Sequence, residues 1–187
     1  MNMLLAFAPF LAFALLERVI GTPNALMTAT AISALLIVRE TVLNKKGLKP
    51  LEAVSLVMFG GLAILTKRAD LHLSVIMVRL IVDGGLLAFV LLSLLIGKPF
   101  TLAYAKDQVS ADIAQSARFH TINGWLSALW ALAFAAIVAA DAAMVYVPSF
   151  TVMAGAVVTL GALAVAALLT SWLPKAMVRK SATKVAA

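Results

Sequence analysis

Apolar residues run in six long stretches along the chain, and short polar turns that contain Gly, Pro or Lys separate them. The stretches cover residues 3–20, 25–43, 51–66, 71–97, 122–147 and 150–173. A helix needs roughly 20 apolar residues to cross a bilayer. The third stretch is short for this and the fourth is long, so the third, or part of the fourth, is open to a re-entrant interpretation. The pattern predicts an all-α, polytopic helical membrane protein with five to six transmembrane helices.

The composition supports this interpretation, because 64% of the residues are hydrophobic, only 12% are charged and the mean hydropathy is +1.07. Soluble domains are about half apolar and a quarter charged. A soluble globule of 187 residues has too little interior for this many apolar side chains, so the helices are expected to lie in lipid. No basic residue precedes the first apolar stretch, which argues against a cleaved signal peptide and predicts a retained membrane helix.

The loops divide the chain into one membrane domain and a tail. Residues 1–174 are expected to form a single helical membrane domain, with an amphipathic cytoplasmic stretch at about 98–121. Pro174 is expected to end the last helix, which leaves residues 175–187 as a basic cytoplasmic tail. Eleven Lys and Arg residues fall in the loops after the second and fourth stretches and in the tail, against three on the opposite side. By the positive-inside rule, both termini are cytoplasmic.

Candidate chemistry is sparse. The net charge of +7 comes from loop and tail residues, so it predicts membrane orientation and no nucleic-acid partner. Cysteine is absent, and the two histidines, His72 and His120, are expected at opposite membrane faces, where they share no metal or haem. The sequence has no GxSxG, P-loop or GxGxxG motif. We therefore predict no enzyme activity, no metal and no cofactor.

Small residues recur at every fourth position of the fifth stretch. Small side chains let helix backbones approach closely in lipid, where burying Leu between helices gains little. The pattern predicts a packing face, either within one chain or across a homodimer. Its members are Ser127, Ala131, Ala135, Ala139 and Ala143.

The fourth stretch carries a charge of each sign inside an apolar run. Ionisable residues in lipid are costly, on the order of 3 kcal/mol each. The four-residue spacing of Arg79 and Asp83 lets their side chains meet on one helix face, as an intramembrane charged pair. Gly84 and Gly85 follow and are candidates for a hinge. The pair is open to three interpretations: a transport site, a structural ion pair, or a misplaced helix end. Asp141 is expected near the outer surface, as a boundary residue.

Several short motifs occur in a familiar order. They are FAPFLAFALLER at the start, TATAISALL, FGGLAIL, GKPF and NGWLSALWALAFAA in the fifth stretch. Together they resemble the intracellular septation protein A family, small bacterial inner-membrane proteins, or a related branch of them. The resemblance covers the chain from Phe7 to about Pro174. It implies a cell inner membrane location and a role in envelope integrity or cell division through other membrane proteins, and it carries over no catalytic residue.

Two hypotheses follow. The first is a non-enzymatic inner-membrane protein of the septation type, which acts through contacts with the bilayer and with envelope or division proteins. The second is a small transporter or channel that uses Arg79 and Asp83 within the membrane. A cavity that meets these two residues would favour transport, and a dry ion pair packed against the fifth or sixth stretch would favour the first hypothesis.

Overall fold

The computed structural model describes residues 3–68 and 73–185, in which every regular element is a helix. The long helices are α1 (Ala8–Ile20), α2 (Thr22–Val38), α3 (Pro50–Arg68), α4 (Val75–Leu95), α7 (Ala117–Tyr146) and α8 (Val152–Val185). A 3₁₀ turn, η1 (Met3–Phe7), leads into α1, and a π-helical turn, η2 (Arg39–Leu43), extends α2. Three short elements precede α7, namely α5 (Leu102–Ala105), η3 (Lys106–Gln108) and α6 (Ala111–Gln115). The all-α prediction is confirmed.

Five of these helices are long and apolar enough to cross a membrane, which makes the chain a multi-pass membrane protein. They are Thr22–Leu43, Pro50–Arg68, Val75–Leu95, Ala117–Tyr146 and Val152–Trp172. The first apolar helix, Leu5–Glu17, is shorter. With η1 included, however, the segment 3–20 extends roughly 30 Å, because a 3₁₀ turn rises faster per residue than an α-helix. The predicted range of five to six membrane helices therefore holds. The helix that is short for a full span is the first one, whereas the sequence suggested that it would be the third.

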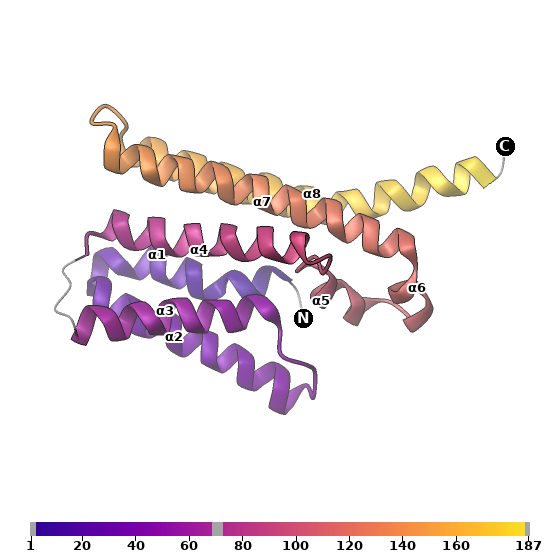
Figure 1. Cartoon of the computed structure of the whole chain (residues 1–187), viewed down its shortest axis with the longest axis horizontal. Coiled ribbons are helices and arrows are strands. Elements are labelled where there is room, and N and C mark those ends of the chain that lie inside the picture. Colours follow the sequence, from indigo (N-terminus) through magenta and orange to yellow (C-terminus); the bar gives the residue numbers. More distant parts are fainter. Residues whose placement is uncertain (1–2, 69–72, 186–187) are drawn as a thin grey trace.

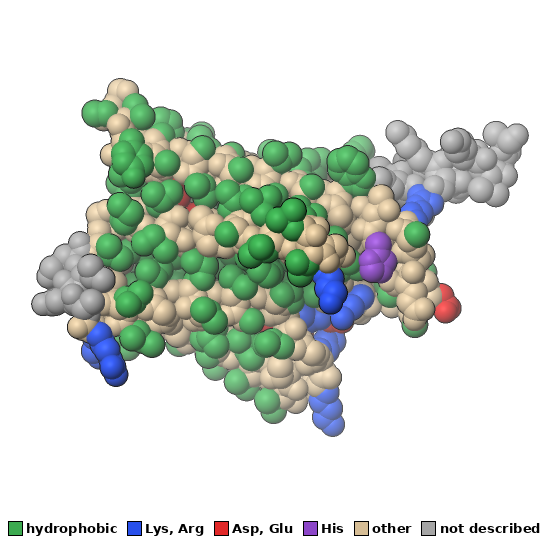
Figure 2. Space-filling model, viewed as in Figure 1, with side chains coloured by type: hydrophobic (Ala, Val, Ile, Leu, Met, Phe, Trp, Pro, Cys, Tyr) green, Lys and Arg blue, Asp and Glu red, His purple; other side chains and the backbone are tan. Residues whose placement is uncertain are grey.

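The helices pack in chain order as an elongated bundle (Figure 1). The closest pairs are α1 with α2, α2 with α3, α4 with α7 and α7 with α8, while α3 contacts α4 less extensively. One end of the bundle carries the 44–49 loop, α5 and α6, and we call it the basic end, because Lys and Arg side chains gather there (Figure 2). The opposite end carries the last turn of α3, the first turn of α4 and the α7–α8 turn.

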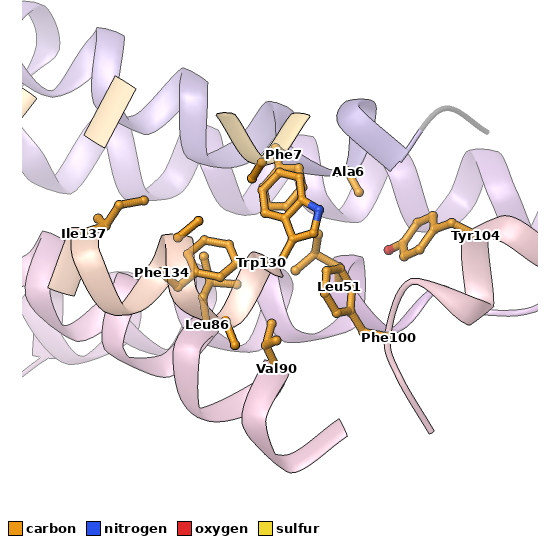
Figure 3. Packing of buried hydrophobic residues seen from close by; sticks show 13 residues of the cluster. Ala6, Phe7, Leu51, Leu86, Val90, Phe100, Tyr104, Trp130, Phe134 and Ile137 are labelled. Carbon is orange, nitrogen blue, oxygen red and sulfur yellow. The ribbon is translucent and has the colours of Figure 1, made fainter. Parts of the chain in front are cut away.

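Aromatic rings fill much of the interior. The Phe7 ring stacks on Trp130 with centroids 4.6 Å apart, and Phe134 packs beside both (Figure 3). Phe59 of α3 contacts the rings of Phe10 and Phe13 of α1. Flat, rigid rings pack against one another more densely than they pack against lipid tails, so ring–ring packing gains dispersion energy. These two clusters tie α1 to α7 and α3.

Two helix boundaries differ from the sequence prediction. Helix α8 continues through Pro174 to Val185, although Pro174 was expected to end it. A proline removes one backbone hydrogen bond, and membrane helices accommodate this loss. Helix α7 begins at Ala117, where the Ser116 hydroxyl accepts a hydrogen bond from the Phe119 amide, so the predicted 98–121 stretch divides into short turns and the first turn of α7. His72 lies outside the described residues.

The two glycines of α4 do not break it. Helix α4 is continuous from Val75 to Leu95, so a hinge at Gly84 and Gly85 is wrong as a description of this state. A Cβ on Gly85 would lie 2.1 Å from the Cε of Met58 on α3, whereas one on Gly84 would have nothing within 4 Å. Gly85 therefore provides space for a neighbouring side chain.

This contrast gives a matched test. We expect Gly85→Ala to be less stable than Gly84→Ala by about 1 kcal/mol, because Met58 must move in the first variant only. Thermal unfolding in mild detergent measures the difference. In a Met58→Ala background the difference should disappear, and its persistence there would contradict the assigned contact.

Candidate functional site

A cluster of charged side chains joins α4 to α7 inside the bundle. The Nε atom of Arg79 lies 3.9 Å from Oδ1 of Asp141, whose side chain is 0% exposed. Asp83 lies one helical turn beyond Arg79 on the same helix, α4. By residue count, Asp83 is roughly 12 Å and Asp141 roughly 8 Å inside the helix ends at the opposite end of the bundle. We call these three residues the charged cluster.

The ion pair within the cluster has a direct energetic consequence. Arg79 is positively charged, and the Asp141 carboxylate on the neighbouring helix is its counter-charge. Isolated charges are expensive in apolar surroundings, so the pairing lowers the cost of burying both groups.

The cluster corrects the sequence interpretation. The ion pair of Arg79 is with Asp141 on another helix, whereas the sequence paired it with Asp83 on its own helix. Asp141, which was expected near the outer surface, does lie close to the end of α7, but its side chain is fully buried and pairs with α4. The available signal was that an arginine within an apolar stretch needs a carboxylate, and Asp141 is a second acidic residue within a long apolar stretch.

A cavity of about 450 Å³ adjoins the charged cluster. Arg79 and Asp83 line one part of it, and Asp83 is only half-buried because it faces this space. Thr159 of α8 also lines the cavity, and its hydroxyl oxygen is buried without a hydrogen-bond partner among the described residues. Sites for small molecules commonly have volumes of this order.

The rest of the lining is apolar and strongly aromatic. Six rings contribute, from η1, α1, α3 and α7: Phe7, Phe10, Phe13, Phe59, Trp130 and Phe134. On the α8 side, the lining extends from Thr159 to Ala167, roughly 12 Å along the helix axis. Phe7, Trp130 and Ala167 therefore lie well away from the charged cluster, which leaves an elongated space with its polar groups toward one end.

The cavity opens sideways. Leu11 of α1 and Leu160 of α8 both line it, yet they are 50% and 64% exposed on the outer surface of the bundle. Helix α8 packs chiefly on α7, so α1 and α8 flank the cavity without closing over it. In a membrane, such an opening faces lipid tails, from which an apolar or amphiphilic molecule can enter.

A second polar cluster, which the sequence did not predict, lies at the basic end. Lys49 is 3% exposed, and its Nζ donates hydrogen bonds to the Ala103 carbonyl at 2.6 Å and to Oδ2 of Asp107 at 2.5 Å. Lys46 is 3.5 Å from the same oxygen. Burial alone would raise the pKa of Asp107, but the Lys49 hydrogen bond and the two lysine charges lower it below 3.8. The cluster fastens the α5–η3 segment to the 44–49 loop.

Buried acids adjoin this second cluster. Glu40 and Glu52 are both 0% exposed, although both lie near the ends of apolar segments. Glu40 accepts a hydrogen bond from the Asn44 amide at 2.9 Å. Burial, followed by the negative charge of Glu52, raises the pKa of the Tyr104 phenol on α5. These groups pack under the α5 segment, outside the cavity lining, so they support the fold at the basic end.

The predicted small-residue face is divided in the structure. Ser127 and Ala131 are buried, and the Ser127 hydroxyl lies 3.0 Å from that of Thr101. Ala135 and Ala139 are exposed, and Ala143 is half-buried. Inside the chain, α7 therefore packs through Phe134, Ile137, Ala140 and Asp141 in its second half.

The sequence and the fold were compared with those of known proteins. No family model, no curated protein and no solved structure matches the chain.

The charged cluster gives a stability prediction. Arg79→Met should lower the free energy of unfolding by about 3–5 kcal/mol, because it leaves the buried acids without a counter-charge. Adding Asp141→Asn should recover more of this loss than adding Asp83→Asn, since Arg79 pairs with Asp141. Unfolding in detergent of the single and double variants measures both couplings. If Asp141→Asn and Asp83→Asn recover the same free energy in the Arg79→Met background, the assignment of Asp141 as the partner of Arg79 is contradicted.

The second cluster gives a pH prediction. The lowered pKa of Asp107 means that the contribution of its ion pair is present above pH 3.8 and is lost as the pH falls through the lower folded-state pKa. Asp107→Asn should therefore destabilise the protein at pH 7 and destabilise it less near pH 3. The exposed Asp112→Asn is the control. A destabilisation by Asp107→Asn that is equal at both pH values would exclude this ion pair as the cause.

Proposed function

We propose that this multi-pass membrane protein binds a small amphiphilic molecule in the lateral cavity and carries it within or across the membrane, without covalent chemistry. The observation that supports this most is the meeting of Arg79 and Asp83 with a cavity that is otherwise apolar. The lateral opening between α1 and α8 gives such a molecule a route from the bilayer. This is the transport alternative of the sequence analysis, applied to amphiphilic solutes.

Two neighbouring carboxyl groups also form the centre of aspartic proteases, so catalysis needs an explicit comparison. In that chemistry, both carboxyl groups face the substrate. Here only Asp83 lines the cavity, while Asp141 is fully buried and paired with Arg79. Binding is therefore the better-supported role for the pair.

Tryptophan fluorescence can test binding. Trp130 lines the cavity, whereas Trp125 and Trp172 are exposed on the outer surface. In a Trp125→Phe, Trp172→Phe background, Trp130 is the single tryptophan of the chain. Bromobenzene should quench its emission in detergent micelles with saturable dependence on concentration.

A matched pair of variants separates cavity binding from partitioning into the micelle. Ala164 lines the cavity and its neighbour Val165 does not. Ala164→Phe should weaken the quenching severalfold, because the added ring occupies the cavity, and Val165→Phe should leave it unchanged. Linear, unsaturable quenching that is the same in both variants would exclude the cavity as a binding site.

Transport itself requires a flux measurement. Reconstituted protein should accelerate the movement of an amphiphilic solute across liposomes, and Arg79→Ala and Asp83→Ala should reduce the rate. If the unaltered protein moves no ion or small solute, the transport part of the proposal fails.

We also propose, as a second function, the septation-type role in the bacterial inner membrane: support of envelope integrity or division through protein contacts, with both termini cytoplasmic. What favours it is the exposed half of the small-residue face on α7, at Ala135 and Ala139, where another helix or a second copy of the chain can approach closely. Ala139→Phe should disrupt co-purification of an envelope partner in mild detergent, and Leu35→Phe, at an exposed position on α2, should not. Recovery of the chain alone as a monomer would contradict this role.

A further inference from the structure

We propose that the molecule bound in the cavity is a phospholipid with a zwitterionic headgroup, whose phosphate binds Arg79 and whose ammonium group binds Asp83. This inference rests on the proposed binding function and names the chemistry of its ligand. Three observations carry it. Two groups of opposite character face the cavity without pairing with each other, aromatic rings lie beside them, and both groups lie toward one end of the bundle.

Arg79 and Asp83 face the same cavity from one helix. They stand one turn apart on α4, a spacing at which an arginine and an aspartate can form an ion pair. In this structure Arg79 pairs with Asp141 instead, and Asp83 has no ion pair among the residues that the structure describes. The lining therefore offers one guanidinium and one carboxyl group, which match the two charged groups of a zwitterion.

The guanidinium of Arg79 keeps hydrogen-bond donors for a phosphate. Its contact with Asp141 is 3.9 Å long, whereas a hydrogen bond between nitrogen and oxygen is rarely longer than about 3.2 Å. Within the described part of the chain, no hydrogen bond joins this guanidinium to another residue. A planar guanidinium can bind a phosphate through two parallel N–H donors. Asp141 therefore compensates the charge of Arg79 and leaves these donors to a ligand.

The rings beside Asp83 suit an ammonium group. Phe13 and Phe59 line the cavity, and they pack in one cluster with Val82, the residue that precedes Asp83. The faces of aromatic rings attract cations, because the electron density of the π-system lies above and below the ring plane. An ammonium group at this level therefore meets the carboxyl group of Asp83 and the aromatic rings together.

Two further acids lie near this end of the cavity, outside its lining. Asp141 contacts Arg79 from α7, and Glu17 of α1 lies one helical turn beyond Phe13, with a buried side chain. Their charge opposes the entry of an anion that carries no positive group. A cation without a phosphate, in contrast, would leave the donors of Arg79 unused in apolar surroundings. A zwitterion avoids both costs, because its ammonium group offsets the acids and its phosphate binds the guanidinium.

The order of polar and apolar lining along the bundle matches a phospholipid of one leaflet. Asp83 and Thr159 lie toward the end that carries the α7–α8 turn, and the apolar lining continues from them toward the basic end along Leu86 and Leu163. A phospholipid in the leaflet at that end has its headgroup on the same side and its chains toward the middle of the bilayer. It can therefore enter sideways between α1 and α8 without turning over. A cavity of about 450 Å³ holds the headgroup and part of the chains, and the rest extends through the lateral opening.

Three single-chain amphiphiles of equal chain length test the headgroup preference. Each competes with bromobenzene in the single-Trp130 protein in dodecyl maltoside micelles, and displacement restores the emission of Trp130. Lysophosphatidylethanolamine should act at a concentration on the order of tenfold lower than the anion lysophosphatidylglycerol or an alkyltrimethylammonium cation, because it alone engages both Arg79 and Asp83. Free phosphoethanolamine should not displace bromobenzene, because it has no chain to occupy the apolar lining.

Two variants should change the preference in opposite directions. Asp83→Asn removes the partner of the ammonium group, so the anion should then compete as well as the zwitterion. The double variant Arg79→Met, Asp141→Asn removes the guanidinium together with its counter-charge, so the cation should then compete as well as the zwitterion. Asp112→Asn, at an exposed position outside the cavity, is the control and should keep the original order. Loss of packing alone would weaken all three amphiphiles equally.

The outcomes separate the chemistry of the ligand from the binding function. If bromobenzene binds saturably but the zwitterion has no advantage over the anion and the cation, the phospholipid inference is overturned and the binding function stands. The same holds if neither variant changes the order, or if free phosphoethanolamine displaces bromobenzene as well as the lysophospholipid does. If the quenching by bromobenzene is linear and no amphiphile protects Trp130, both proposals fail.

Discussion

The cost of a charge in hydrocarbon is the constraint on which this structure depends. Arg79 lies about 6 Å inside the start of the apolar helix α4, and an unpaired charge in hydrocarbon costs on the order of 3 kcal/mol. The partner comes from α7, where Asp141 is fully buried at the α4 interface. That pairing fixes the rotation of both helices about their axes. It thereby turns Asp83 toward the cavity, and it places the aromatic positions of α7 opposite η1 and α1.

The cavity follows from how the remaining helices meet this interface. Helix α8 packs chiefly on α7, and α1 packs chiefly on α2, so no helix fills the space between α1 and α8. Hydrocarbon tails provide almost the same surroundings as leucine, so lipid imposes little pressure to close an apolar gap of this kind. The stacked Phe7 and Trp130 rings support the end of the gap away from the charges, and the Trp130 indole N–H is satisfied by Thr170 of α8 at 2.9 Å.

The sequence predicts the helices well because hydropathy acts within each segment, but it does not predict how the segments rotate against one another. The i, i+4 spacing correctly placed Arg79 and Asp83 on one face of α4, yet the ion-pair partner comes from a position 62 residues beyond Arg79, which only the packing of α4 on α7 selects. Glu40 and Glu52 show a related limit. Both lie near segment ends, yet the packing at that end of the bundle buries both side chains.

The small-residue face shows a further limit. Its four-residue repeat is a property of α7 alone, whereas the buried face of α7 changes along its length. Near Ser127 it meets the turn at Thr101, and beyond Ala131 it meets α4 through larger residues and Asp141. A repeat of four residues also drifts around a helix of 3.6 residues per turn, so its later members rotate away from the face that its first members occupy. Ala135 and Ala139 are exposed for this geometric reason.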